Sequence, residues 1–313
     1  MGKKIVVLGS YVADVAFRAS RLPVWGETLL GSGFALGPGG KGSNQAVAAA
    51  RAGAAVQMLS RLGDDAFGRM AREIWAAAGV DAACVSTAET PTGAAAILID
   101  EARGENAIIV VPGACFTLSA QDVEAAGEVI RRAGVLLTQL ELPLPTVERG
   151  LRLAREAGVR TILNPAPAQP LSDDLLGLVD VLIPNEGEAA KMTGFPVQNR
   201  MQAEAAALAL QQRGARCVIV TLGAQGALVC DGRAQPVLVD AFHAGAVVET
   251  TGAGDAFCGG FAAALSEGAS VLEAARFGCA TAGISVTRAG TAPSMPARAE
   301  IEALLHPSVA PQA

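Results

Sequence analysis

Residues 119–163 read SAQDVEAAGEVIRRAGVLLTQLELPLPTVERGLRLAREAGVRTIL, and this stretch decides the fold. A helical pattern at 119–132 precedes an apolar run at 135–140, and a second helical pattern at 145–157 precedes a short run at 160–163. Short apolar runs that alternate with helices of this length are typical of βαβ units. The sequence therefore predicts an α/β fold built on a mostly parallel sheet.

The same alternation is expected on both sides of this stretch. Further strands are predicted at 5–8, 56–60, 180–183, 216–221, 226–230 and 235–239. Further helices are predicted at 42–53, 64–78, 186–193, 200–213, 254–267, 270–287 and 297–305. Several of these helices end at a glycine, which favours helix termination.

Two segments, at about 12–37 and 92–111, interrupt the alternation. Both contain short apolar runs, turns and glycines without a helical pattern. Because they are all-β, we expect them to pair with each other as a small sheet beside the main layer, as a lid over a cleft. The alternative is that they simply extend the edge of the main sheet. In either case residues 1–313 are predicted to form a single domain.

Composition narrows the class of protein. The 313 residues carry a net charge of −6 and no cluster of Lys and Arg, which argues against a nucleic-acid partner. No charge-free apolar stretch of about 18 residues is present, so we expect no membrane span. None of the six cysteines forms a C-x-x-C pair. We interpret them as buried thiols of a cytoplasmic protein.

Thr250-Thr-Gly-Ala-Gly-Asp-Ala-Phe257 is the most informative motif. Two glycines and an alanine precede an apolar helix, whose first N–H groups and dipole favour an anion. Asp255 follows in the first turn. Phosphoryl transfer requires donors for the charge on the phosphoryl group and a carboxylate that accepts the hydroxyl proton. Gly252, Ala253 and Gly254 are the candidate donors and Asp255 the candidate base, although a plain glycine-rich helix start gives the same pattern.

Gly37-Pro-Gly-Gly-Lys-Gly-Ser-Asn-Gln45 is the second glycine-rich motif. It matches the G-x-G-x-x-G of dinucleotide-binding proteins formally. That interpretation requires a preceding strand in a βαβ unit, whereas the preceding segment is the turn-rich lid. We favour a turn that brings the backbone of Gly39 and Gly40 close to a ligand, with Asn44 presenting an amide. An NAD(P)-dependent oxidoreductase is the remote alternative.

Two predicted strands end in polar or glycine-bearing turns. Asn185 and Glu188 follow one strand, and Thr221-Leu-Gly-Ala-Gln-Gly226 follows another. Open α/β sheets bind ligands at the carboxyl ends of their strands, and Glu188 there can hold Mg²⁺ through water. The alternatives are a helix cap at Asn185 with Glu188 as a surface residue, and a hairpin turn at 221–226.

Together these motifs resemble the PfkB family of sugar kinases, and within it the ribokinases. The segments 39–45 and 250–257 are similar to its two motifs, and the resemblance covers nearly the whole chain. It implies a three-layer ribokinase-like sandwich with a small β-sheet lid, and a homodimer in which the lids clasp each other.

The resemblance also implies site residues. Sugar hydroxyls would be bound by Asp14, Gly40, Lys41, Asn44 and Glu141. The ATP site would be lined by Asn185, Thr221, Gly223, Gly226 and Cys279, with Glu188 supporting Mg²⁺. An activating K⁺ would lie near Glu249, Thr251, Ser285, Arg288, Gly290 and Ser294. Asp255 would be the base and residues 252–254 the anion hole.

The chain departs from the family pattern at three positions. Val12 replaces an Asn that usually stands two residues before the Asp14 position. Because Val cannot hydrogen-bond, this pocket is expected to prefer a sugar that is altered or lacks a hydroxyl there, unless a neighbouring group or water compensates. Glu249 replaces an Asp, which puts K⁺ activation in question. Cys279 replaces a His that is frequent near adenine.

The expected activity is transfer of the γ-phosphoryl group of ATP to a primary hydroxyl of ribose or a closely related sugar. Alternative acceptors are deoxyribose, fructose, a keto-deoxy sugar acid and a nucleoside. A non-catalytic sugar-binding regulator is a further alternative, against which the intact Asp255 argues.

Overall fold

The fold is built around a twisted nine-stranded sheet in a computed structural model that describes residues 2–232 and 234–306. The strand order is β13-β12-β11-β10-β9-β8-β1-β4-β5, and only β12 and β13 run antiparallel to their neighbours. The strands are β1 (Ile5–Leu8), β4 (Val56–Gly63), β5 (Asp81–Ala88), β8 (Val135–Thr138), β9 (Arg160–Leu163), β10 (Val181–Leu182), β11 (Cys217–Thr221), β12 (Ala227–Cys230) and β13 (Val237–Val239).

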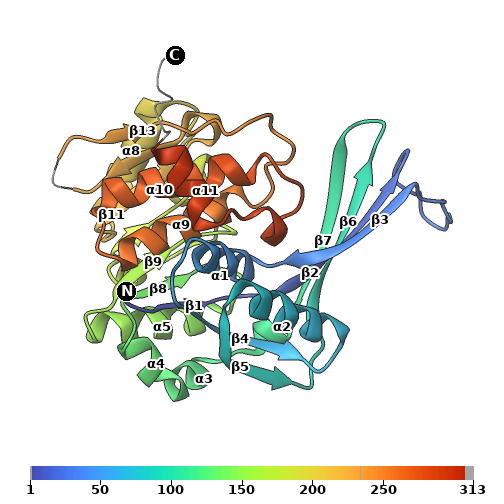
Figure 1. Ribbon diagram of the computed structural model, residues 1–313, viewed down its shortest axis with the longest axis horizontal. Coiled ribbons are helices and arrows are strands. Elements are labelled where there is room, and N and C mark those ends of the chain that lie inside the picture. The colour runs from blue at the N-terminus through green and yellow to red at the C-terminus, as the bar shows by residue number, and fades with distance from the viewer. Residues whose placement is uncertain (1, 233, 307–313) are drawn as a thin grey trace, which may run out of the picture.

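Helices cover both faces of this sheet, which gives three layers (Figure 1). One face carries α1 (Lys41–Arg51), α2 (Ala66–Ala78), α9 (Ala253–Ser266), α10 (Val271–Ser285) and α11 (Arg298–Leu305). The other carries α3 (Ala120–Ala125), α4 (Gly127–Arg131), α5 (Leu144–Glu156), α6 (Asp173–Leu176), α7 (Glu186–Thr193) and α8 (Arg200–Gln212). Short 3₁₀ turns lie at Ala114–Thr117, Gly223–Gln225 and Ala292–Ser294.

Successive side chains of the central strands point to opposite faces of the sheet, so the hydrophobic core is divided in two. Ile5 and Val7 of β1 pack into the core beneath α1 and α9, whereas Val6 and Leu8 pack into the core beneath α3 and α5. All four side chains are fully buried, as expected for a central strand covered on both faces.

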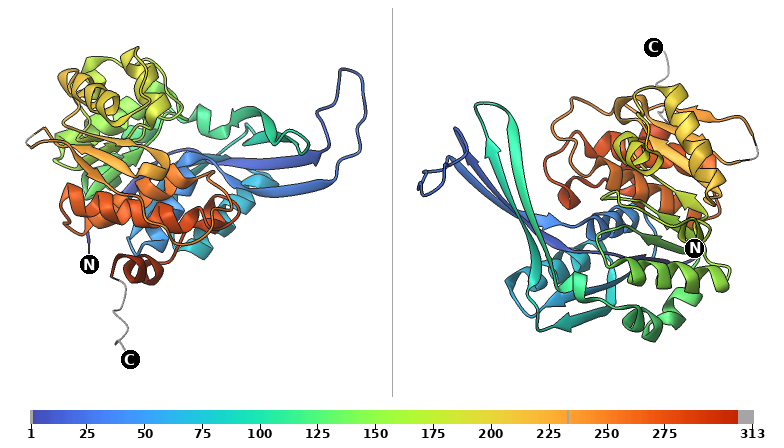
Figure 2. Two further views of the ribbon diagram at one scale, coloured as in Figure 1. Left: turned by 90° about the horizontal axis from the view of Figure 1, so that it is seen from above. Right: turned by 180° about the vertical axis from the view of Figure 1, so that it is seen from behind.

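A separate four-stranded sheet projects from this body (Figures 1 and 2). Its order is β3-β2-β6-β7, with β2 and β6 parallel and the outer pairs antiparallel. The strands are β2 (Val12–Ala19), β3 (Gly33–Gly39), β6 (Thr92–Asp100) and β7 (Glu105–Gly113). The predicted segments 12–37 and 92–111 therefore pair with each other, and we call this sheet the lid.

Small residues bring α1 and α9 into close contact. A Cβ placed on Gly259 of α9 would lie 2.4 Å from the Cβ of Ala48 in α1. At the start of α1, a Cβ on Gly42 would lie 2.5 Å from the Cα of Gly9. Any side chain at either position would push the helix away. The two predicted motifs, which open α1 and α9, are thereby held next to each other.

The predicted mostly parallel sheet with an additional small sheet is confirmed, with three local differences. The helix predicted at 119–132 is divided into α3 and α4 at Ala126. The edge strand β5 (Asp81–Ala88) and the short helix α6 were not predicted. Of the helices in residues 2–232 and 234–306, none combines the length and apolar character needed to cross a membrane.

Candidate active site

Asp255 lies where α1 meets α9, and it is buried. Its Oδ2 accepts a hydrogen bond from Asn44 Nδ2 at 3.1 Å, and its Oδ1 accepts one from Gln45 Nε2 at 2.9 Å. The two donors are more than 200 residues away in the sequence. Residues 39–45 and 252–255, the two glycine-rich motifs, are therefore in direct contact.

The first turn of α9 presents backbone donors beside this carboxylate. Gly252 adopts φ 83°, a left-handed conformation that favours glycine. The N–H groups of Gly252 and Gly254 have no acceptor among residues 2–232 and 234–306. Ala253 differs from the expectation, because its N–H donates to the carbonyl oxygen of Thr250 at 3.1 Å. Among the described residues, the unpaired amides of this turn are thus those of the two glycines, and Ala253 supports the turn.

A chain of buried side-chain amides, which begins at Gln45, fixes the orientation of the Asp255 carboxylate. Gln45 Nε2 also lies 3.1 Å from Asn164 Oδ1, and Gln45 Oε1 accepts from Gln139 Nε2 at 2.7 Å. Asn164 in turn donates to the carbonyl oxygen of Ile183 at 2.8 Å. Buried amides that bond one another in this way hold their members in one arrangement.

Asn44 carries an unsatisfied atom. While its Nδ2 bonds Asp255, its Oδ1 is buried without a partner among the described residues. A buried acceptor left unpaired costs about 1–3 kcal/mol. A ligand hydroxyl that donates to Asn44 Oδ1 would remove this cost and would lie next to Asp255.

Acidic side chains gather at the base of the lid beside this point. Glu141 accepts hydrogen bonds from the backbone N–H of Lys41 at 2.8 Å and from the hydroxyl of Ser10. A Cβ on Gly39 would lie 2.4 Å from both carboxylate oxygens of Asp14, so only glycine lets Asp14 approach the turn. Gly40 follows with φ 82°.

Burial and mutual repulsion perturb these groups. Burial, followed by the carboxylates of Glu141, Asp255 and Glu249, raises the pKa of Asp14 to about 6. Burial also raises the pKa of Glu141. The Asp255 carboxylate raises the pKa of Lys41 more than burial lowers it, so this ammonium stays charged. Buried carboxylates with an ammonium are suited to a neutral ligand with several hydroxyl groups, which donate to the former and accept from the latter.

A cavity of about 140 Å³ lies beside Asp255. It is lined by Lys41, Asn164, Ile183, Asn185, Glu188, Thr221, Gly252, Gly254, Asp255 and Cys258. The carboxyl ends of β9, β10 and β11 supply its floor, which is where open α/β sheets bind ligands.

Asn185 and Glu188 form a capping box at the start of α7. Asn185 Oδ1 accepts from the N–H of Glu188 at 2.8 Å, and Glu188 Oε2 accepts from the N–H of Asn185 at 2.9 Å. The helix-cap alternative is therefore correct for Asn185, and Asn185 and Glu188 also line the cavity. Burial raises the pKa of Glu188.

Of the other predicted ATP residues, Thr221 lines this cavity, whereas Gly223, Gly226 and Cys279 lie outside it. Thr221 donates its N–H to the carbonyl oxygen of Pro184, and a 3₁₀ turn at Gly223–Gln225 leads to β12, as in the hairpin alternative. A Cβ on Gly226 would lie 2.0 Å from the carbonyl oxygen of Val239. Cys279 in α10 is buried, with its Sγ 3.9 Å from the same oxygen. Gly223, Gly226 and Cys279 do not line the cavity that contains Asp255.

The positions assigned to K⁺ form a folded segment next to α9. The N–H groups of Val248 and Glu249 donate to the carbonyl oxygen of Val286 at 2.8 and 3.2 Å, and Glu249 Oε2 accepts from the N–H of Gly290 at 2.8 Å. Residues 248–249 are therefore tied to 286–290.

The remaining K⁺ positions are engaged differently. The hydroxyls of Ser285 and Ser294 donate to backbone carbonyls of Ala282 and Thr291. Arg288 pairs with Glu300 on the surface, and Thr251 is exposed. Among the described residues, no group of three or more His, Cys, Asp or Glu side chains is placed to hold a metal ion by itself.

Sequence reasoning did not assign roles to Gln45, Gln139, Asn164 and Thr291. The hydroxyl of Thr291 donates to the carbonyl oxygen of Pro38, which ties the base of the lid to the segment beside Gly252. A polar residue at the end of a buried strand, as at Gln139 and Asn164, is the signal that indicates such positions.

The glycine pattern at 37–42 does not occur in a dinucleotide-binding unit. It is preceded by β3, an antiparallel lid strand paired with β2, rather than by the first strand of a βαβ unit. The oxidoreductase alternative therefore lacks its structural requirement.

The fold and this site define a carbohydrate kinase, and a family model bears this out. Residues 2–298 match the model described as pfkB family carbohydrate kinase, and the chain belongs to that family. It is a phosphotransferase that acts on a sugar hydroxyl.

Comparison with individual relatives indicates which sugar kinases this chain is similar to. The chain is 42% identical to the ribokinase of Haemophilus influenzae over 98% of its own length and 100% of that protein. It is 36% identical to the deoxyribokinase of Salmonella typhimurium, over 93% and 95% of the two chains. Its structure is similar to that of Arabidopsis thaliana ribokinase complexed with ribose and ATP, with a TM-score of 0.91, 34% identity and 97% and 99% coverage. The ribokinase-like fold predicted from the motifs is confirmed.

Proposed function

We propose that this chain transfers the γ-phosphoryl group of ATP to a primary hydroxyl of ribose or a closely related sugar, with Asp255 as the base. The observation that carries the proposal is the pairing of Asn44 with Asp255. It leaves Asn44 Oδ1 buried and unsatisfied on the side chain that contacts Asp255, and a hydroxyl donating to this oxygen would remove the cost of the unpaired acceptor.

The acceptor is bound at the base of the lid. Asp14, Glu141 and Asn44 offer acceptor oxygens to the sugar hydroxyls, while Lys41 and the N–H of Gly40 offer donors. Asp255 takes the proton of the hydroxyl as its oxygen attacks the γ-phosphorus in line. The amide chain through Gln45 keeps the carboxylate directed at that hydroxyl.

Donors for the transferred group come from α9. The N–H groups of Gly252 and Gly254, at the positive end of the helix dipole, are placed to bind the phosphoryl oxygens while charge develops on them. ATP would extend from this point along Asn185, Thr221, Gly223 and Gly226 towards Cys279.

Mg²⁺ fits the cavity, because Glu188 and Asp255 place two carboxylates against the single ammonium of Lys41. Such sites hold Mg²⁺ by one or two carboxylates, waters and the substrate phosphates. Glu188 would hold the ion through water. When bound, Mg²⁺ would neutralise charge on the phosphate groups.

K⁺ activation is proposed at the segment that includes Glu249, Thr251, Ser285, Arg288, Gly290 and Ser294. The carboxylate of Glu249 reaches Gly290 and so fixes the turn that would surround the ion. Replacement of the usual Asp by Glu changes the position of this carboxylate, so activation by K⁺ is to be measured against Na⁺.

Val12 favours a second acceptor, 2-deoxyribose. Its side chain is buried at the start of β2, and its backbone is so close to Gly40 that a Cβ there would lie 2.8 Å from the N of Val12. A valine leaves a nearby sugar hydroxyl without a partner, at a cost of roughly 1–3 kcal/mol. A sugar that lacks this hydroxyl avoids that cost.

The lid is proposed to close over the sugar, within a single domain of residues 1–313, and to pair with the lid of a second copy. Phe17 and Phe34 contact each other across β2 and β3 with tilted rings whose centroids lie 5.3 Å apart, yet they are 45% and 62% exposed. Ile109 and Val111 of β7 are similarly exposed. An apolar sheet of this kind is suited to burial in a homodimer. Cytoplasmic residence is proposed because all six cysteines are free thiols.

A panel of acceptors with coupled ADP detection tests the proposal. Ribose, 2-deoxyribose, fructose, a keto-deoxy sugar acid and a nucleoside would each be assayed with Mg·ATP in Na⁺ and in K⁺. We expect the highest kcat/KM for ribose or 2-deoxyribose. A higher value for fructose, the sugar acid or the nucleoside would refute the proposed acceptor class.

A further inference from the structure

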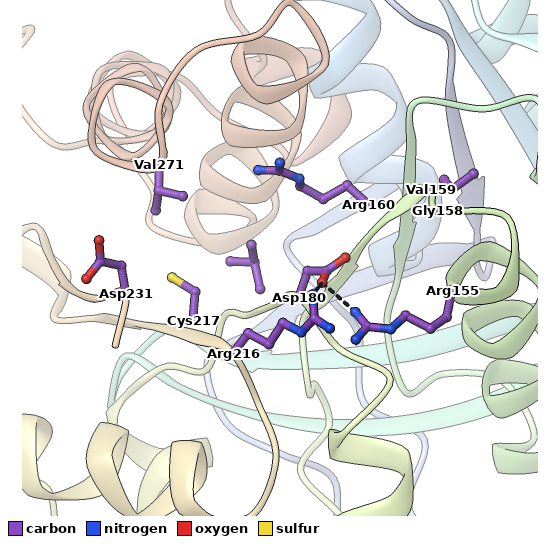
Figure 3. A pocket seen from close by; sticks show the side chains of 10 residues that line it. Arg155, Gly158, Val159, Arg160, Asp180, Arg216, Cys217, Asp231 and Val271 are labelled. Carbon is purple, nitrogen blue, oxygen red and sulfur yellow. Dashed lines mark hydrogen bonds and ion pairs between the residues drawn. The ribbon is translucent and has the colours of Figure 1, made fainter. Parts of the chain in front are cut away.

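A second cavity, of about 530 Å³, lies at the opposite end of the strands from Asp255 (Figure 3). Arg160, Val181 and Cys217, the first residues of β9, β10 and β11, line it. The other ends of these strands lead to Asn164, Ile183 and Thr221 in the catalytic cavity. The two cavities are therefore separated by the length of the strands and can be occupied at the same time.

Three arginines bring guanidinium groups to the lining of this second cavity. Asp180 Oδ1 accepts from Arg155 at 2.7 Å and from Arg216 at 3.3 Å (Figure 3). Asp180 Oδ2 accepts from the N–H of Thr161 at 3.0 Å. Both carboxylate oxygens are thus engaged, and Asp180 holds two guanidinium groups side by side.

Arg160 adds a third guanidinium. It forms no ion pair within residues 2–232 and 234–306. The cavity is thus lined by three guanidinium groups and two carboxylates, Asp180 and Asp231, in a chain whose net charge is −6. The fifteen-residue helix α10 begins at Val271 on the same wall, and its dipole adds positive potential.

The ligand chemistry follows from this lining. Guanidinium groups bind phosphate oxygens in a bidentate manner, and two held in place by Asp180 lose little freedom on binding. Val159, Val181 and Val271 add apolar surface suited to a carbon skeleton. Asp231 lies across the cavity from Arg155 in Figure 3. A volume of this size is in the range of small-molecule sites.

We propose that this cavity binds a small organic monophosphate, at a site distinct from the catalytic one. Arg160 and Arg216 contact the phosphate, and Arg155 with Asp180 fixes Arg216. The carbon skeleton lies over Val181 and Val271.

The probe is glycerol 3-phosphate, titrated by calorimetry onto the full chain after ribose, Mg²⁺ and a non-hydrolysable ATP analogue have been added. Saturable binding is expected. Arg160→Gln should weaken it about 10- to 100-fold, the usual effect of losing a charged hydrogen bond. Arg132→Gln, which alters an exposed arginine of the α3–α4 side, is the matched control and should bind like the wild type.

Hydrogen exchange of the wild-type chain decides the location independently of any variant. Glycerol 3-phosphate should protect residues 158–161 and 216–218. Protection confined to residues 39–45 and 252–255, the absence of saturable binding, or unchanged affinity in folded Arg160→Gln would each overturn the proposal. Because this measurement uses the wild-type chain and does not depend on turnover, failure of this proposal can be distinguished from failure of the proposed kinase activity.

Discussion

Replacing Gln45 with Leu tests how the base is held. Gln45 Nε2 donates to Asp255 Oδ1, and Gln45 Oε1 accepts from Gln139. Leu has a similar volume but no polar atoms. The change removes a hydrogen bond to a charged group, which is worth about 1.5–3 kcal/mol, and leaves Gln139 without its acceptor at a cost of about 1–3 kcal/mol. Gln45→Leu should therefore lower the free energy of unfolding by about 2.5–6 kcal/mol.

The kinetic effect should separate kcat from KM. The Gln45 amide contacts Asp255 rather than the sugar-binding side chains, so the base loses one of its two orienting bonds. We expect kcat to fall about 10- to 100-fold, which corresponds to about 1.4–2.7 kcal/mol, with KM for the sugar changed less than threefold or so.

The assays are urea denaturation and coupled ADP detection over a range of sugar concentrations. Gln121→Leu is the control, since Gln121 is exposed in α3. It should behave like the wild type in both assays. If Gln45→Leu kept wild-type kcat, or if only KM rose, the buried amides would not position the base and the reasoning would fail.

Three further predictions concern the sugar pocket and the packing beneath it. The pKa of Asp14 is raised to about 6, so its carboxyl becomes neutral and loses acceptor capacity as the pH falls through this value. We therefore expect kcat/KM for the sugar to decrease when the pH is lowered below about 6. A pH profile that stays flat from 5 to 7 would contradict this, and Asp14→Asn should abolish the limb. Val12→Asn should raise kcat/KM for ribose relative to 2-deoxyribose about 5- to 100-fold, because a new hydrogen bond to the sugar hydroxyl would contribute roughly 1–3 kcal/mol. An unchanged ratio in the acceptor assay would show that Val12 does not determine specificity. Gly259→Val places a Cβ 2.4 Å from that of Ala48, so the free energy of unfolding should fall by about 1–3 kcal/mol or more. Gly187→Val, in α7, where the added Cβ would lie 3.5 Å from its nearest neighbour, provides the comparison for the backbone effect of valine in a helix.

The sequence predicted the layers and the two motifs but not the details that depend on distant contacts. Strand β5 was missed because Asp81–Ala88 lies at the sheet edge with little apolar alternation. The break between α3 and α4 lies within an Ala-Gly pair whose helical pattern continues on both sides. Local periodicity does not determine either feature, since the tertiary contacts do so.

The candidate site shows the same limit. The glycine motifs indicated an anion-binding helix start near a carboxylate, and Asn44 and Asp255 are indeed in contact. The hydrogen bond of Ala253 to Thr250 and the bonds of Gln45 to Asp255 and Asn164 depend on turn geometry and on partners more than 100 residues away. Spacing within a motif carries no information about such partners.

Single-turnover measurement of Asp255→Asn tests the central claim most directly. The substitution keeps the size of the side chain but removes its ability to accept a proton. Pre-steady-state phosphoryl transfer to the preferred sugar should slow about 10²- to 10⁴-fold, while calorimetry should still detect binding of the sugar and ATP. Transfer at close to the wild-type rate in a folded Asp255→Asn protein would show that another group accepts the proton, and would contradict the account.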